Sequence, residues 1–174
     1  MTHPKSFYHN YQANNNLFEI DRLLINEVLS VSPQTILDFG TGTGKNIKFI
    51  HDLKPSIVVC GLDMSFLNII HARAKNELPF LIIGDESHLC RLTNFDVIMT
   101  CSVLCHIENI NEIVKEFKRI VNYSIFIAET NNIAGEFYYP HDYESFGFKK
   151  TNKSWHSAAN NSTYNIYQWN KLKQ

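Results

Sequence analysis

The chain has 174 residues, about the size of one domain, and is long enough to bury a hydrophobic core without disulfides or metals. Apolar residues make up 44% and charged residues 19%, which excludes an intrinsically disordered chain. The formal net charge of -1 gives no general attraction to nucleic acids or anionic membranes. No apolar run approaches the roughly 18 residues of a membrane span or resembles a leading signal segment, so we expect a cytoplasmic protein with no membrane association.

The four cysteines, Cys60, Cys90, Cys101 and Cys105, lie scattered in apolar segments without paired CxxC spacing. This arrangement favours free thiols in a reducing compartment over a zinc site. We therefore expect no bound metal.

Helices and strands alternate along the first 130 residues. Apolar residues at helical spacing predict helices, and short runs rich in Ile, Val and Leu predict buried strands. In chain order these are a helix at 16–29, a strand at 35–39, a helix from Ile47 to Leu53, a strand at 57–62, a helix at 65–76 with Ser65 as N-cap, strands at 80–83 and 95–100, a helix at 111–121 and a strand at 123–128. This alternation predicts an α/β protein whose parallel sheet is covered on both faces.

Beyond Asn131 the sequence becomes polar and aromatic. Gly147–Phe148 and Tyr164–Trp169 are predicted strands with no convincing helix between them, which favours an antiparallel hairpin that completes the sheet. No repeat, low-complexity tract or linker separates this part from the rest. We therefore expect a single domain over residues 1–174.

A glycine-rich loop, Gly40-Thr41-Gly42-Thr43-Gly44, lies where the first predicted strand turns into a helix. Glycines allow a backbone to approach a ligand closely, and the following helix N-terminus offers unpaired N–H groups. A phosphate-binding P-loop is disfavoured because Phe39 and Asn46 stand where that motif needs a glycine and a Ser or Thr. The dinucleotide fingerprint requires glycine at Lys45 and also fails, although a degenerate version stays open.

Two acidic residues follow the next two strands. Asp63 ends the second predicted strand, where a carboxylate can accept bonds from ribose hydroxyls, and Asp85 ends the third, where a carboxylate can bind an exocyclic amine of adenine. Both would share one sheet edge with the glycine loop. The alternative is that Asp63 and Asp85 only cap the following helices.

This combination resembles class I S-adenosylmethionine-dependent methyltransferases over nearly the whole chain. The resemblance implies a doubly wound, mostly parallel seven-stranded sheet with a C-terminal antiparallel hairpin, a Rossmann-like fold. It also implies S-adenosylmethionine as cofactor and S-adenosylhomocysteine as product. The matching segments are the glycine motif at 37–44, Asp63, Gly84-Asp85, Phe95–Ile98, Leu104–Ile107, Phe146–Phe148 and Tyr164–Trp169.

By the same resemblance, residues 16–130 would be the cofactor-binding core and 131–174 the acceptor-side loop and hairpin. The glycine loop would contact the methionine part of the cofactor, Asp63 the ribose and Met64 the adenine. The backbone at Cys101 would contact the amino-acid end. The implied cofactor-binding residues are Tyr11, Asp38, Gly40, Thr41, Gly42, Gly44, Asp63, Met64, Asp85, Glu86 and Cys101.

Two histidines are candidate catalytic bases. His106 follows the fourth strand and has an ordinary pKa near neutrality, although it can equally order a loop. His141 falls after the fifth strand, where this family commonly builds its acceptor pocket, or is an exposed loop residue. Residues 1–15, with Tyr11 and other aromatics, are a candidate lid or pack against the first helix.

The acceptor is not identified by the sequence. The short stretch 131–143 favours either a small-molecule acceptor or an externally presented one. Completion of the acceptor pocket by a partner subunit, as in a homodimer, is a further alternative. From Ser145 onward lysines and aromatics alternate without any acidic residue, which is typical of solvated strands and less often of RNA binding. The alternatives are a non-catalytic S-adenosylmethionine-binding or partner subunit, an RNA methyltransferase and an NAD-dependent oxidoreductase.

Overall fold

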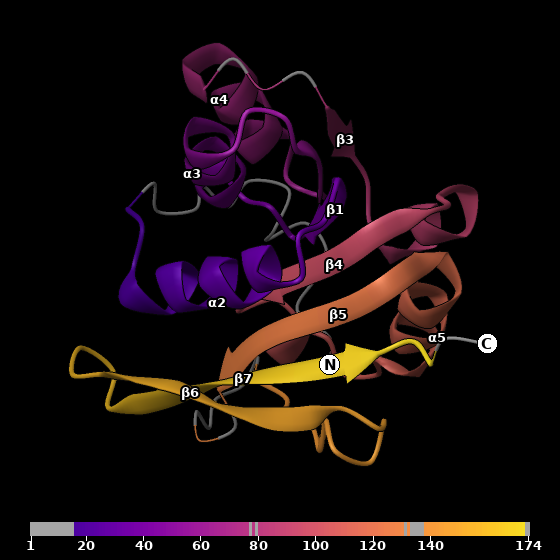
Figure 1. The fold of residues 1–174 in the computed structure, drawn as a ribbon. Helices are drawn as coiled ribbons and strands as arrows, with labels where there is room; N and C mark the ends of the chain where they lie inside the picture. The colour runs from indigo at the N-terminus through magenta and orange to yellow at the C-terminus, as the bar shows by residue number, and fades with distance from the viewer. Residues whose placement is uncertain (1–15, 77, 79, 131, 133–137, 173–174) are drawn as a thin grey trace.

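The computed structural model describes residues 16–172 except 77, 79, 131 and 133–137 (Figure 1). Its strands are β1 (Thr35–Phe39), β2 (Val58–Asp63), β3 (Leu81–Ile83), β4 (Phe95–Cys101), β5 (Val121–Thr130), β6 (Lys149–Ser157) and β7 (Ser162–Asn170). Its helices are α2 (Glu19–Ser30), α3 (Lys45–Leu53), α4 (Phe66–Asn76) and α5 (Asn111–Ile120), with 3₁₀ turns η1 (Glu86–Arg91) and η2 (Leu104–His106). None of the helices in this part of the chain has the length and apolarity to cross a membrane.

The described strands form one seven-stranded sheet in the order β3-β2-β1-β4-β5-β7-β6. Strands β1 to β5 are parallel, and β7 is antiparallel to both β5 and β6. From β1 the sheet extends through β2 to β3 on one side, and from β4 it extends through β5 to the β7–β6 hairpin on the other. The predicted doubly wound, mostly parallel sheet with a closing antiparallel hairpin is therefore confirmed.

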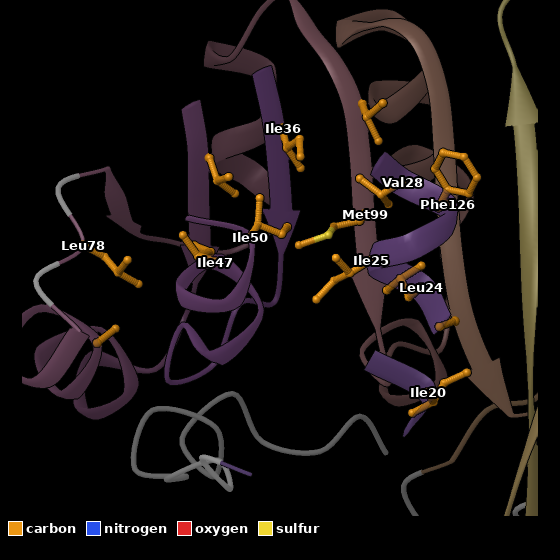
Figure 2. Packing of buried hydrophobic residues seen from close by; sticks show 14 of the residues in the cluster. Ile20, Leu24, Ile25, Val28, Ile36, Ile47, Ile50, Leu78, Met99 and Phe126 are labelled. Atoms are coloured by element: carbon orange, nitrogen blue, oxygen red, sulfur yellow. The ribbon is translucent and has the colours of Figure 1, made fainter. Parts of the chain in front are cut away.

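The sheet separates two hydrophobic cores, because neighbouring residues of a strand face opposite sides. On one face α2 packs on the sheet through Ile20, Leu24, Ile25 and Val28, together with residues of α3 and α4 (Figure 2). On the other face α5 buries Phe117, whose ring meets the edge of Phe39 at 5.1 Å between centroids. Helices thus cover both faces of the parallel part.

Most predicted elements are present with bounds that differ by one to three residues. Ser65 accepts a hydrogen bond from the backbone N of Asn68 at 3.2 Å, which confirms its capping of α4. The predicted strand at Gly147–Phe148 is wrong, because Gly147 adopts φ +81° in a turn and the strand begins only at Lys149. This edge strand pairs with one neighbour and is largely exposed, so it carries lysines instead of an apolar pattern.

Candidate functional site

The glycine loop lies at the carboxyl end of β1, beside β4, where the strand order reverses. Gly40, Gly42 and Gly44 all have positive φ, at 73°, 57° and 76°. The backbone N of Gly40 and of Thr41 donates to the carbonyl oxygen of Leu62 in β2, at 2.8 and 3.1 Å. Open α/β sheets bind ligands at this crevice. The loop is therefore fixed to the sheet at the place where a ligand is expected.

The loop also touches the segment that follows β4. A Cβ atom on Gly40 would lie 2.3 Å from Cγ2 of Val103, a distance that no real Cβ adopts. Gly40 is thus required both by its left-handed backbone and by this contact. Gly44 occupies the N-cap position of α3 and supplies no side-chain cap. The N-terminal N–H groups of α3 therefore face the loop without a capping side chain.

Asp38 and Asp63 are buried beneath the loop. Asp38 is 2% exposed and accepts a hydrogen bond from Oγ1 of Thr41 at 2.7 Å. Burial raises the pKa of Asp38 to about 7, against the lowering effect of the Thr41 bond. Asp63 accepts from the backbone N of Gly42 at 2.7 Å and of Ser65 at 2.8 Å, and burial raises its pKa too. Asp63 therefore contacts the glycine loop as well as the start of α4.

An ion pair that the sequence did not indicate lies on the α2 side of the loop. Nζ of Lys45 lies 2.6 Å from Oδ2 of Asp21, which is 1% exposed, and also lies over the ring of Phe18. The negative charges of Asp21 and Asp63 help to raise the pKa of Asp38, and Lys45 lowers it. This group of side chains thus holds three buried carboxyl groups and one partly exposed ammonium group.

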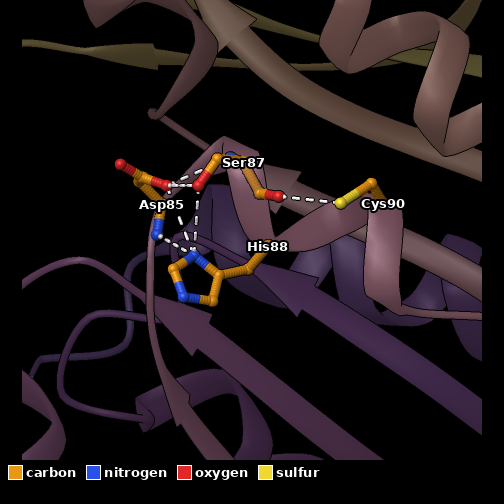
Figure 3. Close-up of polar contacts among 4 residues, drawn as sticks. All are labelled: Asp85, Ser87, His88 and Cys90. Atoms are coloured by element: carbon orange, nitrogen blue, oxygen red, sulfur yellow. Dashed lines mark hydrogen bonds and ion pairs between the residues drawn. The ribbon is translucent and has the colours of Figure 1, made fainter.

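Asp85 directly precedes η1 and acts as its N-cap. Its Oδ1 accepts from the backbone N of Ser87 at 3.0 Å and lies 3.3 Å from Nδ1 of His88 (Figure 3). Within the chain, Asp85 thus makes the contacts of a helix cap, which is the alternative role that the sequence left open for it. Met64, directly after Asp63, is partly buried.

Glu86 is the first residue of η1 and lines an open hollow of about 280 Å³ between η1 and α5. The other lining residues are Ser87, Cys90, Glu112, Ile113 and Glu116. No other predicted site residue lines this hollow, so the structure does not bring Glu86 together with the glycine loop there.

The segments after β4 and β5 meet at the two candidate bases. Nε2 of His141 lies 3.0 Å from the carbonyl oxygen of Leu104 and 2.9 Å from that of Ile107. Because carbonyl oxygens only accept, Nε2 carries the hydrogen and Nδ1 of the neutral ring is the basic nitrogen. His141 is therefore partly buried and links the segment after β5 to the segment after β4. The ring of His106 packs against Tyr138, 4.8 Å between centroids.

Cys101 is the last residue of β4, and Glu129 is the penultimate residue of β5. The Cys101 side chain is partly buried, and burial raises the pKa of its thiol well above the usual range. Glu129 was not singled out from the sequence, yet it is 0% exposed and accepts bonds from the backbone N of Val103 and Leu104. An acidic residue directly after the apolar run 125–128 was the available signal. Tyr11 and the predicted lid lie outside the described residues.

The comparisons with known proteins agree with this geometry. A family model described as "Methyltransferase domain" matches residues 37–124, from β1 to the start of β5. No curated protein matches the chain.

Several solved structures share the fold. N-methyltransferase NodS from Bradyrhizobium japonicum WM9, in complex with S-adenosyl-L-homocysteine, has a TM-score of 0.73 at 11% identity, covering 89% of this chain and 87% of NodS. TehB from Haemophilus influenzae has a TM-score of 0.67 at 16% identity, covering 86% of this chain and 61% of TehB. The plantazolicin methyltransferase BpumL, also in complex with S-adenosylhomocysteine, has a TM-score of 0.56 at 23% identity, covering 64% of this chain and 46% of BpumL.

The family model covers half of the chain and includes the glycine loop, Asp63 and Asp85. The seven-stranded sheet with its closing hairpin belongs to a fold that NodS shares over 89% of this chain. The chain therefore belongs to the methyltransferase-domain family, and its likeness to class I S-adenosylmethionine-dependent methyltransferases is confirmed.

Proposed function

We propose that this protein binds S-adenosylmethionine at the glycine loop and transfers its methyl group to a small-molecule acceptor. The observation that carries the proposal is the loop itself: three left-handed glycines, fixed to β2 and lying over the buried Asp38 and Asp63, at the crevice between β1 and β4. The S-adenosylhomocysteine bound to NodS and to BpumL, which is the product of such a transfer, is consistent with it.

The charges around the loop fit this cofactor. Asp21, Asp38 and Asp63 are buried near the cationic side chain of Lys45. S-adenosylmethionine carries two positive groups, the sulfonium and the ammonium, and one carboxylate. A cluster with excess negative charge is stabilised by a ligand of net positive charge, because buried charges are costly unless they are paired. The cluster would attract the cationic cofactor more than its uncharged-sulfur product.

Each part of the cofactor then has a candidate contact. Oδ1 of Asp63 accepts from the backbone N of Ser65 and from Nδ2 of Asn68, whereas Oδ2 accepts from the backbone N of Gly42. The second lone pair of Oδ2 would accept from a ribose hydroxyl. Asp85 would accept from the adenine amine, with Met64 against the ring. Gly40 and the backbone at Cys101 would hold the methionine end. The predicted role of Glu86 in cofactor binding would fall to its backbone, which directly follows Asp85.

When bound, the sulfonium supplies an activated methyl group. The chain has to orient the acceptor in line with that group and exclude water, an effect worth several kcal/mol. Nδ1 of His141 is the unprotonated nitrogen of the neutral ring, so it can take a proton from an amine or hydroxyl acceptor. His106, the last residue of η2, is the second candidate for this step.

Calorimetry with S-adenosylmethionine, S-adenosylhomocysteine and NAD tests the cofactor. Asp63→Ala should weaken S-adenosylhomocysteine binding by about 1–3 kcal/mol, because the ribose hydroxyls lose their acceptor. Asp52→Ala is the matched control, since Asp52 is exposed at the far end of α3 and pairs with Lys48 and His51 on its own helix. Unchanged affinity in Asp63→Ala would place the ribose elsewhere, and heat with NAD alone would favour an oxidoreductase.

The acceptor class is tested by incubating the protein with methyl-labelled donor and fractionated small molecules, RNA and protein. Label in the small-molecule fraction supports the proposal. Label in RNA would contradict the acceptor class. Cofactor binding with no labelled product in any fraction would favour a non-catalytic, cofactor-binding subunit.

A further inference from the structure

We propose that Glu129 is a positioning residue that links the cofactor-binding loop to the histidine-bearing side of the site. It holds the segment between β4 and η2, which contacts the glycine loop on one side and the segment that carries His141 on the other. The inference rests on the proposed function, since it assigns to Glu129 a role in cofactor affinity.

The carboxyl group of Glu129 binds the backbone of the turn that follows β4. Oε1 of Glu129 accepts from the backbone N of Val103 at 2.7 Å and of Leu104 at 2.8 Å. The preceding residue, Ser102, adopts φ +56°, an unfavourable conformation for a residue with a side chain. Its backbone N donates to the carbonyl oxygen of Ala128 at 3.0 Å. Strand β5 thus holds both the end of β4 and the first N–H groups of the following turn.

The segment held by Glu129 forms one wall of the glycine loop. The Val103 side chain fills the space where a Cβ of Gly40 would lie. Because protein interiors are closely packed, a shift of Val103 would leave a gap against Gly40 or press on it. The position of the glycine loop therefore depends on the turn that Glu129 fixes.

The same segment anchors the acceptor side. The carbonyl oxygen of Leu104 accepts from Nε2 of His141, and that of Cys105 accepts from the backbone N of Tyr139 at 2.7 Å. The backbone N of His106 donates to the carbonyl oxygen of Val103 at 3.0 Å. Both candidate bases are thus hydrogen-bonded to residues that lie within three positions of Val103 or Leu104, the two residues that Glu129 binds.

The remaining carboxylate oxygen lies in a closed, uncharged environment. Oε2 of Glu129 and the hydroxyl of Tyr143 are buried and have no hydrogen-bond partner among the described residues. The ionisable groups that face Glu129 are Cys101 from β4, Cys105 from η2 and Tyr143 from the segment after β5. Burial raises the pKa of each of them, so none carries a charge at pH 7. An amide in place of the carboxyl group should therefore be tolerated.

The experiment compares Glu129→Gln with Glu129→Leu. Gln keeps an oxygen that can accept from Val103 and Leu104, whereas Leu fills similar space without an acceptor. Two readouts apply: the Kd of S-adenosylhomocysteine by calorimetry, and amide hydrogen exchange of the peptides that contain 40–44 and 102–107. Ser124→Ala is the control, because Ser124 is also buried on β5 but bonds Asn170 at the opposite end of the strand.

We expect Glu129→Leu to raise the Kd at least tenfold and to increase exchange in both segments, Glu129→Gln to stay within threefold of wild type, and Ser124→Ala to change neither readout. Wild-type affinity and protection in Glu129→Leu would overturn the proposal, as would equal losses in the Gln and Leu variants. If Glu129→Leu does not fold, Val103→Ala tests the link: the Kd should rise while residues 104–107 stay protected, and an unchanged Kd would refute it.

The outcomes also distinguish this proposal from the cofactor assignment. If wild-type protein does not bind S-adenosylhomocysteine, the proposed function fails. Exchange in 40–44 still reports whether Glu129 fixes the glycine loop.

Discussion

At the scale of single residues, Gly40 and Gly147 form a matched pair. Both have positive φ, but a Cβ on Gly40 would meet Val103 at 2.3 Å, whereas one on Gly147 would meet nothing closer than 3.8 Å. Gly147→Ala should therefore cost only the left-handed backbone, about 1–2 kcal/mol. Gly40→Ala should cost clearly more, because it adds the steric overlap. Urea unfolding of both variants measures the difference.

The double variant Gly40→Ala/Val103→Ala separates the two causes. Removing the Val103 methyl groups should restore part of the free energy of unfolding lost in Gly40→Ala. Equal stability of the two single glycine variants would show that the overlap is relieved at no cost.

Asp38 predicts how stability depends on pH. Its pKa rises from 3.8 to about 7 on folding, so the folded state binds the proton more tightly. The stability due to this proton is complete below pH 4 and is lost as pH rises to 7, by about 4 kcal/mol in total. Asp38→Asn should reduce this decline and make the protein without ligand more stable at pH 8. Glu129, with a pKa raised to about 7, contributes a decline in the same direction.

Urea unfolding of wild type and Asp38→Asn at pH 5 and pH 8 checks this. The control is Asp52→Asn, whose side chain is 54% exposed. A wild-type free energy of unfolding that increases from pH 5 to pH 8 would contradict the assignment.

At the scale of elements, β6 is an edge strand whose exposed backbone groups can pair with another chain. Its exposed lysines Lys149, Lys150 and Lys153 oppose such pairing by charge repulsion. Replacing all three by Val should produce association, measured by light scattering, while circular dichroism of the soluble fraction stays unchanged. The same three positions changed to Glu should remain monodisperse. Association of the Glu variant would show that β6 is not the surface involved.

Elements were predictable where burial dictates the residue pattern. Thr35–Phe39 was predicted with its observed bounds, since β1 has neighbours on both sides and helices on both faces. Strand β6 itself, Lys149–Ser157, was missed because an edge strand with little burial needs no apolar alternation. The turn at Gly147 was mistaken for a strand because two residues, Gly147 and Phe148, carry too little pattern to separate a turn from a strand.

At the scale of the whole molecule, the sheet is shared by both cores, so the two faces should unfold together. The two tryptophans report on them separately: Trp155 packs at the edge of the α2 core and Trp169 at the edge of the α5 core. Leu24→Ala should cost about 2–5 kcal/mol. It should lower the urea midpoint equally for a Trp155-only and a Trp169-only protein. Two separate midpoints would show that the faces unfold independently.

By itself, the sequence determined the alternating α/β order, the closing hairpin, the glycine loop and the two strand-end acids. These follow from local patterns: apolar periodicity, and glycines or carboxylates directly after strands. Only the tertiary structure decided which distant groups meet. It brought Lys45 to Asp21 of α2, Val103 to Gly40, and Glu129 to the turn after β4. Such contacts depend on strand order and register across the sheet, which no local pattern encodes.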